Sequence, residues 1–172
     1  MKIFALSGSN SENSSNTKLL NFIKNNFEQD VEVADVRGIP LFKEGAEVPA
    51  KITELAEKIA DSDLILISTP ERLHSVPSCL KSVIDWFSVS GNPLAGKKVV
   101  ILSADNSPQG GARAQTRLKT ILSNSTFHVT IFGQDEFMLS NADHAFEADR
   151  LVDTNTIKFL YHFFDEVFEW SK

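Results

Sequence analysis

The chain has 172 residues, of which 42% are hydrophobic and 23% are charged, and its formal net charge at pH 7 is −6. This length and composition are typical of one compact globular domain, so we expect residues 1–172 to form a single domain. An acidic chain without a basic stripe argues against a nucleic-acid partner, because Lys and Arg side chains are needed to neutralise phosphates.

The sequence also bears on the compartment. No apolar stretch is long enough to span a bilayer, and Met1 leads into a short apolar run without the basic start of a signal peptide. A single cysteine, Cys79, excludes an internal disulfide framework and fits a reducing compartment. We therefore expect a cytoplasmic protein with no membrane partner.

Short β-rich runs alternate with longer stretches in which apolar residues recur at helical spacing. In chain order the pattern predicts strand Ile3–Leu6, helix Leu19–Phe27, strand Val31–Val36, helix Ile52–Ile59, strand Leu64–Ser68, helix Leu80–Phe87, strand Val99–Ser103, helix Ala114–Leu122, strand Phe127–Phe132 and helix Ile157–Phe168. Between the last two, Gly133–Val152 has no clear period, and we expect a loop there with at most a short helix.

The alternation of strands and helices predicts βαβ units and a parallel sheet. Leu64–Ile67 is apolar at every position, as expected of a central strand covered on both faces. The order of elements predicts an α/β, flavodoxin-like, doubly wound fold. It has a five-stranded parallel sheet of order 2-1-3-4-5 and helices on both faces.

Ligands of such folds bind beyond the carboxyl ends of the strands, which draws attention to the loop Ser7–Thr17 after the first strand. This loop is rich in hydroxyl and amide side chains and leads into a helix, whose free backbone N–H groups suit a phosphate. It matches neither a P-loop nor a GxGxxG dinucleotide motif. Alternatively, Ser14, Ser15 and Asn16 serve only as helix caps.

The loop after the third strand is more specific. It begins Thr69-Pro70-Glu71-Arg72-Leu73-His74-Ser75-Val76-Pro77 and continues through Leu80-Lys81 to Ile84-Asp85-Trp86. Together with Gly8-Ser9 and Ser14–Asn16, it resembles the NAD(P)H-dependent FMN reductase family. The first loop of that family typically reads Gly-Ser-x-Arg-x-x-Ser-x-Asn, and its second begins Thr-Pro-Glu-Tyr-Asn. The resemblance runs from Met1 to about Phe132, including Gly110-Gly111.

The resemblance implies FMN as the cofactor and NAD(P)H as the co-substrate. It implies an oxidoreductase that passes hydride through the flavin to a small acceptor: free flavin, a quinone, an azo compound or a metal oxyanion. It also implies a homodimer or homotetramer. The cofactor-binding positions that it implies lie in three loops: Ser9, Ser11, Ser14, Asn16 and Thr17; Pro70, Glu71, Arg72 and Leu73; Ser103, Gly110 and Gly111.

The chain departs from the family pattern at four positions. Ser11 stands in place of an arginine, Arg72-Leu73 in place of Tyr-Asn, and His74 where a small residue is common. Arg72 either faces the pyrimidine end of the flavin, binds an acidic substrate or is solvated. His74 either protonates a reduced quinone or is an ordinary surface histidine.

These departures keep alternative functions open. One is a flavodoxin-like binding module with weak or lost FMN binding that acts through protein contacts, and another is a one-electron carrier. No Gly-x-Ser-x-Gly motif is present, and no metal-ligand spacing joins the four histidines. An enzyme whose cofactor performs the redox step does not require a catalytic side chain.

Overall fold

A computed structural model describes residues 1–172. The elements in chain order are β1 (Lys2–Ser7), α1 (Ser15–Asn26), β2 (Asp30–Asp35), α2 (Ala50–Ala60), β3 (Leu64–Ser68), α3 (Ser78–Val89), β4 (Lys98–Ala104), α4 (Ala112–Leu122), β5 (Thr130–Ile131), β6 (Phe137–Leu139), β7 (Phe146–Glu147), β8 (Arg150–Leu151) and α5 (Thr154–Ser171). None of these helices has the length and apolar character needed to cross a membrane.

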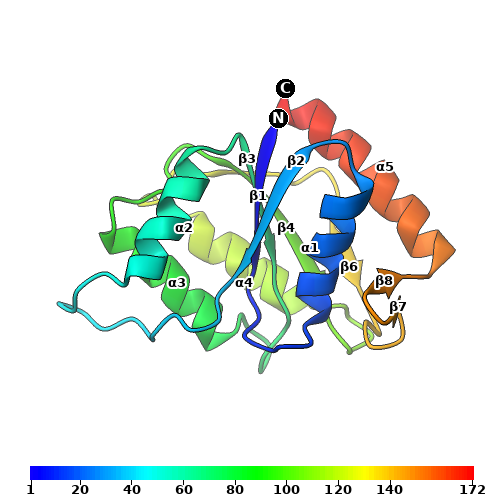
Figure 1. Cartoon of the computed structure of the whole chain (residues 1–172), viewed down its shortest axis with the longest axis horizontal. Helices are drawn as coiled ribbons and strands as arrows, with labels where there is room; N and C mark the ends of the chain where they lie inside the picture. The colour runs from blue at the N-terminus through cyan, green and yellow to red at the C-terminus, as the bar shows by residue number, and fades with distance from the viewer.

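The main sheet is parallel and has the order β2-β1-β3-β4-β5 (Figure 1). β3 lies at its centre, and all five of its residues are buried, as the apolar run Leu64–Ile67 predicts for the first four. The carboxyl ends of β1, β2 and β3 are level, since Ser7 pairs with both Asp35 and Ser68. The predicted fold and strand order are therefore confirmed, and the loops that follow these strands meet at one edge of the sheet.

The fifth position of the sheet differs from the prediction. Within the predicted strand Phe127–Phe132, only Thr130–Ile131 pairs with β4, because His128 has a left-handed backbone (φ 50°) and Phe127 is buried beneath the helices instead. A second short strand, β6, pairs with the carboxyl end of β4. The fifth strand is thus split into two pieces.

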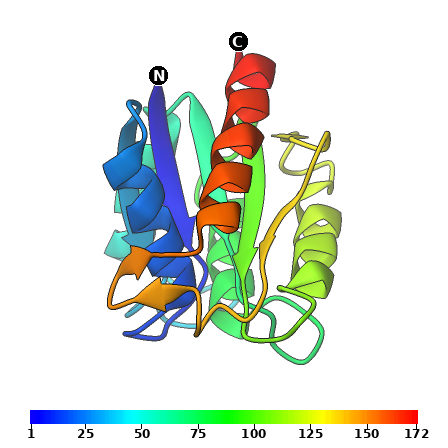
Figure 2. The same ribbon diagram turned by 90° about the vertical axis from the view of Figure 1, so that its right-hand side faces the viewer.

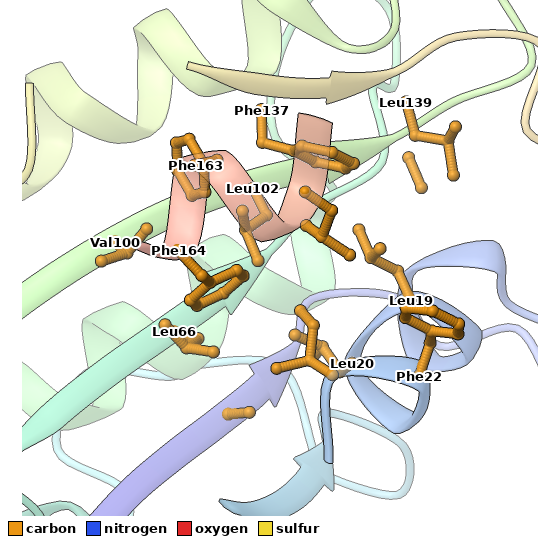
Figure 3. Close-up of a cluster of buried hydrophobic side chains, with 14 of the residues drawn as sticks. Leu19, Leu20, Phe22, Leu66, Val100, Leu102, Phe137, Leu139, Phe163 and Phe164 are labelled. Atoms are coloured by element: carbon orange, nitrogen blue, oxygen red, sulfur yellow. The ribbon is translucent and has the colours of Figure 1, made fainter. Parts of the chain in front are cut away.

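Helices cover both faces of the sheet, as predicted. α1 and α5 pack on one face, against alternate residues such as Leu66 and Leu102, and α2, α3 and α4 pack on the other. In the α1/α5 layer, Phe163 and Phe164 of α5 lie over β3, β4 and β6, beside Leu20 of α1 (Figure 3). Phe163 and Phe164 are fully buried in this layer, whereas Phe159 and Tyr161 of the same helix are each 40% exposed.

The segment Gly133–Val152, predicted as loop, contains β6 and the antiparallel hairpin β7–β8. The hairpin lies beside α1 (Figure 2), where Lys18 Nζ donates to Ala148 O at 2.8 Å. Its strands have two residues each, too few to produce a readable alternation. The prediction of an irregular segment was wrong at these positions for that reason.

Candidate functional site

The first loop, Ser7–Thr17, lies against the end of the central strand β3. Gly8 donates its N–H to Ser68 O at 2.8 Å, next to the start of α3. A Cβ atom at Gly8 would lie 2.7 Å from Leu80 Cδ2 and 3.2 Å from Ser68 O, which only glycine avoids. The glycine therefore sets how deeply the loop Ser7–Thr17 sits at the sheet edge.

The start of α1 presents unpaired donors at this edge. Ser14 is the N-cap, and its Oγ accepts from the N–H of Thr17 at 3.4 Å. The N–H groups of Ser15 and Asn16 have no hydrogen-bond partner, and the first turn holds no acidic residue. Free N–H groups at the positive end of a helix dipole bind anions, so this turn fits a phosphate.

Asn16 lies beneath this turn and is 2% exposed. Its Oδ1 accepts from Ser68 Oγ at 2.7 Å and from Ala104 N–H at 3.0 Å, while its Nδ2 donates to Ala104 O at 2.8 Å. The side chain thus ties α1 to the ends of β3 and β4. The backbone N–H of Asn16 and the second hydrogen of its Nδ2 have no partner. That these groups contact a phosphate stays a prediction.

The second loop closes in a tight turn over Arg72–Ser75. Arg72 and Ser75 exchange backbone hydrogen bonds of 2.8 and 2.9 Å, and the two residues between them, Leu73 and His74, have φ values of 47° and 62°. Such a turn favours Asn-Gly, because side chains other than Asn and Asp are strained at positive φ. Leu73 is 100% exposed at the tip, and His74 is also exposed.

The base of the second loop is fixed by charged groups. Glu71 forms an ion pair with Arg113, whose Nη1 lies 3.0 Å from Glu71 Oε1, and the Arg113 N–H also donates to Glu71 at 3.1 Å. The carboxylate of Asp105 accepts from the N–H of Glu71 at 3.0 Å and from that of Ser107 at 2.9 Å. These contacts join the second loop to the third loop and to α4.

The electrostatics of Asp105 follow from these contacts. Burial raises the pKa of its carboxyl group, but hydrogen bonds from Ser107 and Glu71 and the charge of Arg72 outweigh burial. The net pKa lies below the ordinary value for aspartate, so Asp105 carries a negative charge at neutral pH.

The third loop turns back at Gly110 and Gly111, whose φ values are 59° and 88°. Ser103 Oγ donates to Gly110 O and accepts from Gln115 Nε2 at 2.8 Å, and both side chains are buried. A Cβ atom at Gly111 would lie 2.8 Å from Ser103 Cβ. The predicted residues Ser103, Gly110 and Gly111 therefore fix the conformation of the third loop: the glycines through their left-handed backbone, and Ser103 through its hydroxyl group.

The three loops enclose a hollow of about 300 Å³. It is lined by Ser9, Ser11, Asn13, Ser14, Ser15, Asn16, Pro70, Glu71, Arg72, Ala104, Asp105 and Asn106. Seven of the predicted cofactor-binding residues lie in this lining. The others lie outside it: Thr17, whose Oγ1 donates to Ser7 Oγ, the exposed Leu73, Ser103, Gly110 and Gly111. His74 does not line the hollow either.

Sequence reasoning missed Asp105, Asn106 and Arg113. Asp105 and Asn106 directly follow β4, at the edge of the sheet where ligands of such folds bind. This position could have identified them from the sequence. Arg113 was not identifiable, because its importance comes from Glu71, which lies 42 residues earlier in the chain.

Comparison with known proteins identifies the family. The sequence profile of the NADPH-dependent FMN reductase family matches residues 1–144. The chain belongs to this family. A relative from Vibrio ruber, the NADH:(hydroxy)cinnamate reductase subunit CrdA, is 34% identical over 173 residues, covering 98% of this chain and 84% of the relative. An NAD(P)H-dependent FMN reductase of Pseudomonas aeruginosa is 37% identical over 128 residues, covering 72% and 68%.

Among solved structures, the NAD(P)H:(acceptor) oxidoreductase FerB of Paracoccus denitrificans superposes with a TM-score of 0.84 at 26% identity, covering 99% of this chain and 96% of FerB. The family, FMN and NAD(P)H, all predicted from the two loops, are confirmed. The chain is a flavin-dependent oxidoreductase of the FMN reductase family. Nothing in these comparisons favours a binding module that has lost the flavin.

Proposed function

We propose that residues 1–172 form one FMN-binding domain and that the hollow between the three loops holds the cofactor. The observation that carries the proposal is the pair of unpartnered N–H groups of Ser15 and Asn16, which open onto this hollow. Ser9, Ser11 and Ser14 add hydroxyl groups around them. Pro70 and Ala104, from the second and third loops, line the same hollow and would contact the rest of the cofactor.

When bound, FMN supplies the redox chemistry, taking two electrons from NAD(P)H and releasing them to an acceptor. The residues of this chain bind and orient it. The Glu71–Arg113 ion pair ties the second loop to α4, and the Asp105 carboxylate ties it to the third loop, so these contacts would hold the walls of the hollow in place around the cofactor.

We propose a small molecule as the acceptor: free flavin, a quinone, an azo compound or a metal oxyanion. Quinone reductases of Escherichia coli and Burkholderia are also relatives of this chain, which supports a quinone. Steady-state NADH and NADPH oxidation, measured with one acceptor of each class under anaerobic conditions, ranks them. If the protein has FMN bound and its rate of NADH or NADPH oxidation does not depend on any added acceptor, the proposal is contradicted.

A matched pair of variants tests the site without unfolding the protein. Ser15→Asp places a carboxylate in the first turn of α1, which is favourable for the helix but repels a phosphate. Ala50→Asp makes the same change in the first turn of α2, outside the hollow. Fluorescence titration with FMN should show weak or absent binding for Ser15→Asp and wild-type binding for Ala50→Asp. Equal binding by both variants would show that the phosphate lies elsewhere.

We further propose a homodimer or homotetramer in the cytoplasm. Three large apolar side chains in or near α3 are exposed: Leu41, Leu73 and Val89, at 66%, 100% and 56%. A partner copy seated on α3 would cover them. The single cysteine supports a reducing compartment. Analytical ultracentrifugation of wild type and Val89→Glu tests the assembly, and a monomeric wild type would contradict it.

A further inference from the structure

The charge balance of the hollow is incomplete without a cation. A phosphate ester of FMN carries close to two negative charges at neutral pH, and the side chains at the start of α1 are neutral hydroxyl and amide groups. Partial charges of a helix terminus equal only about half an elementary charge. A nearby cation that is free to pair with the phosphate therefore adds a charge-assisted contact that these groups do not provide.

The basic residues around the hollow differ in whether they already have partners. Lys18 donates to Ala148 O and lies 3.5 Å from Asp149. Arg113 is paired with Glu71.

Arg37, in the loop after β2, is also engaged. Its Nη2 lies 2.6 Å from Asp35 Oδ2, and its Nε donates to the same oxygen at 2.8 Å. Its backbone N–H donates to Asp35 as well, at 2.9 Å. This guanidinium is therefore committed to the end of β2.

Arg72 is the exception. Its guanidinium forms no ion pair and no side-chain hydrogen bond, whereas its backbone is fixed by the turn to Ser75. Arg72 is exposed, and it lines the same hollow as Ser11 and Ser14. The charge of Arg72 acts on the carboxylate of Asp105 in the hollow, but the two side chains form no ion pair.

We propose, on the basis of the proposed FMN site, that Arg72 is the residue that pairs with the cofactor phosphate. The cation is supplied by the second loop, and the first loop, with Ser11 facing the hollow, contributes hydroxyl and N–H donors only. A guanidinium presents two parallel N–H groups to phosphate oxygens, a geometry that neither hydroxyls nor amides provide. Arg72 is thus a binding residue that recognises the phosphate and not the ring.

Riboflavin separates the two halves of the cofactor, since it carries the ring and the ribityl chain but no phosphate. We expect Arg72→Ala to raise the dissociation constant of FMN about 10- to 100-fold, as for loss of a hydrogen bond to a charged group, and to leave that of riboflavin unchanged. The FMN affinity of the variant should also depend less on salt. Arg117→Ala, an exposed arginine of α4 outside the hollow, is the matched control and should bind both flavins as wild type does.

A second variant tests the position of the charge. Ser11→Arg, added to Arg72→Ala, returns a cation to the hollow from the first loop and should restore the preference for FMN over riboflavin. Thermal unfolding of each chain without flavin shows whether the variants are folded. An equal loss of FMN and riboflavin binding in Arg72→Ala would place the guanidinium at the ring and overturn the assignment.

The outcomes also separate this assignment from the proposed site. A wild-type chain that binds FMN, with an Arg72→Ala variant of unchanged flavin preference, overturns the role of Arg72 alone. A wild-type chain that binds neither flavin overturns the proposed site, and the role of Arg72 falls with it.

Discussion

The tight turn at Leu73-His74 stores strain that a double substitution should release. Both residues have left-handed backbones, with φ values of 47° and 62°, and Leu73 is 100% exposed, so its side chain packs against nothing within the same chain. Leu73→Asn combined with His74→Gly places in the turn the two residue types that such a turn prefers. The backbone hydrogen bonds between Arg72 and Ser75 do not involve the replaced side chains and are retained.

The expected stabilisation follows from the two positions. A left-handed backbone costs about 1–2 kcal/mol for a residue with a Cβ atom, and asparagine relieves part of this cost. Glycine relieves it fully but adds about 0.5–1 kcal/mol of backbone entropy to the unfolded chain. We therefore expect a gain of about 1–2 kcal/mol, which for a chain of this size raises the unfolding temperature by about 2–8 °C.

Urea unfolding followed by circular dichroism measures the gain, with Leu73→Ala as the control. Alanine removes the exposed side chain but keeps the Cβ atom and hence the strain, so its stability should match wild type. A double variant no more stable than wild type, or an alanine variant equally stabilised, would refute the strain argument.

Three further changes have defined outcomes. Gly111→Ala should lower the free energy of unfolding by about 2–3 kcal/mol, because it adds a Cβ at a φ of 88° and 2.8 Å from Ser103 Cβ; unchanged urea midpoints would contradict this. Asn16→Ala should cost about 2–4 kcal/mol in the same assay, since it leaves buried groups at the ends of β3 and β4 unpaired, and a smaller loss would mean that water replaces the amide. The pKa of Asp105 is lower folded than unfolded, so its charge stabilises the fold above the ordinary aspartate pKa of about 3.9, and this contribution is lost as the pH falls through the folded pKa. Asp105→Asn should consequently lose less stability than wild type on acidification below about pH 4, and parallel pH profiles would exclude this role.

The central strands were predictable because their environment is uniform. β3 and the middle of β4 are buried on both faces, so Leu64–Ile67 and Val99–Leu102 are apolar at every position. At the β5/β6 edge of the sheet, an apolar residue does not by itself indicate a strand. Phe127 is apolar because it fills the core, not because it pairs in the sheet, whereas the three paired residues of β6 follow a polar stretch.

The residues of the candidate site also fall into a group that the sequence predicts and a group that it does not. Ser9, Ser14 and Pro70 were predictable, because each lies in a loop that must meet the others beyond the carboxyl ends of parallel strands. The internal hydrogen bonds of Asn16 and the contact of Asp105 with Glu71 join residues 88 and 34 positions apart, which a single sequence does not reveal.

The split fifth strand also affects how copies of this protein meet. An exposed, continuous edge strand is a template on which another chain can add and begin aggregation. Here one edge is broken into β5 and β6, and the other, β2, carries Asp30, Glu32 and Asp35 along its length. Because both borders of the sheet resist strand addition, association in concentrated solution should proceed through helical surfaces, and it should not progress to fibrils.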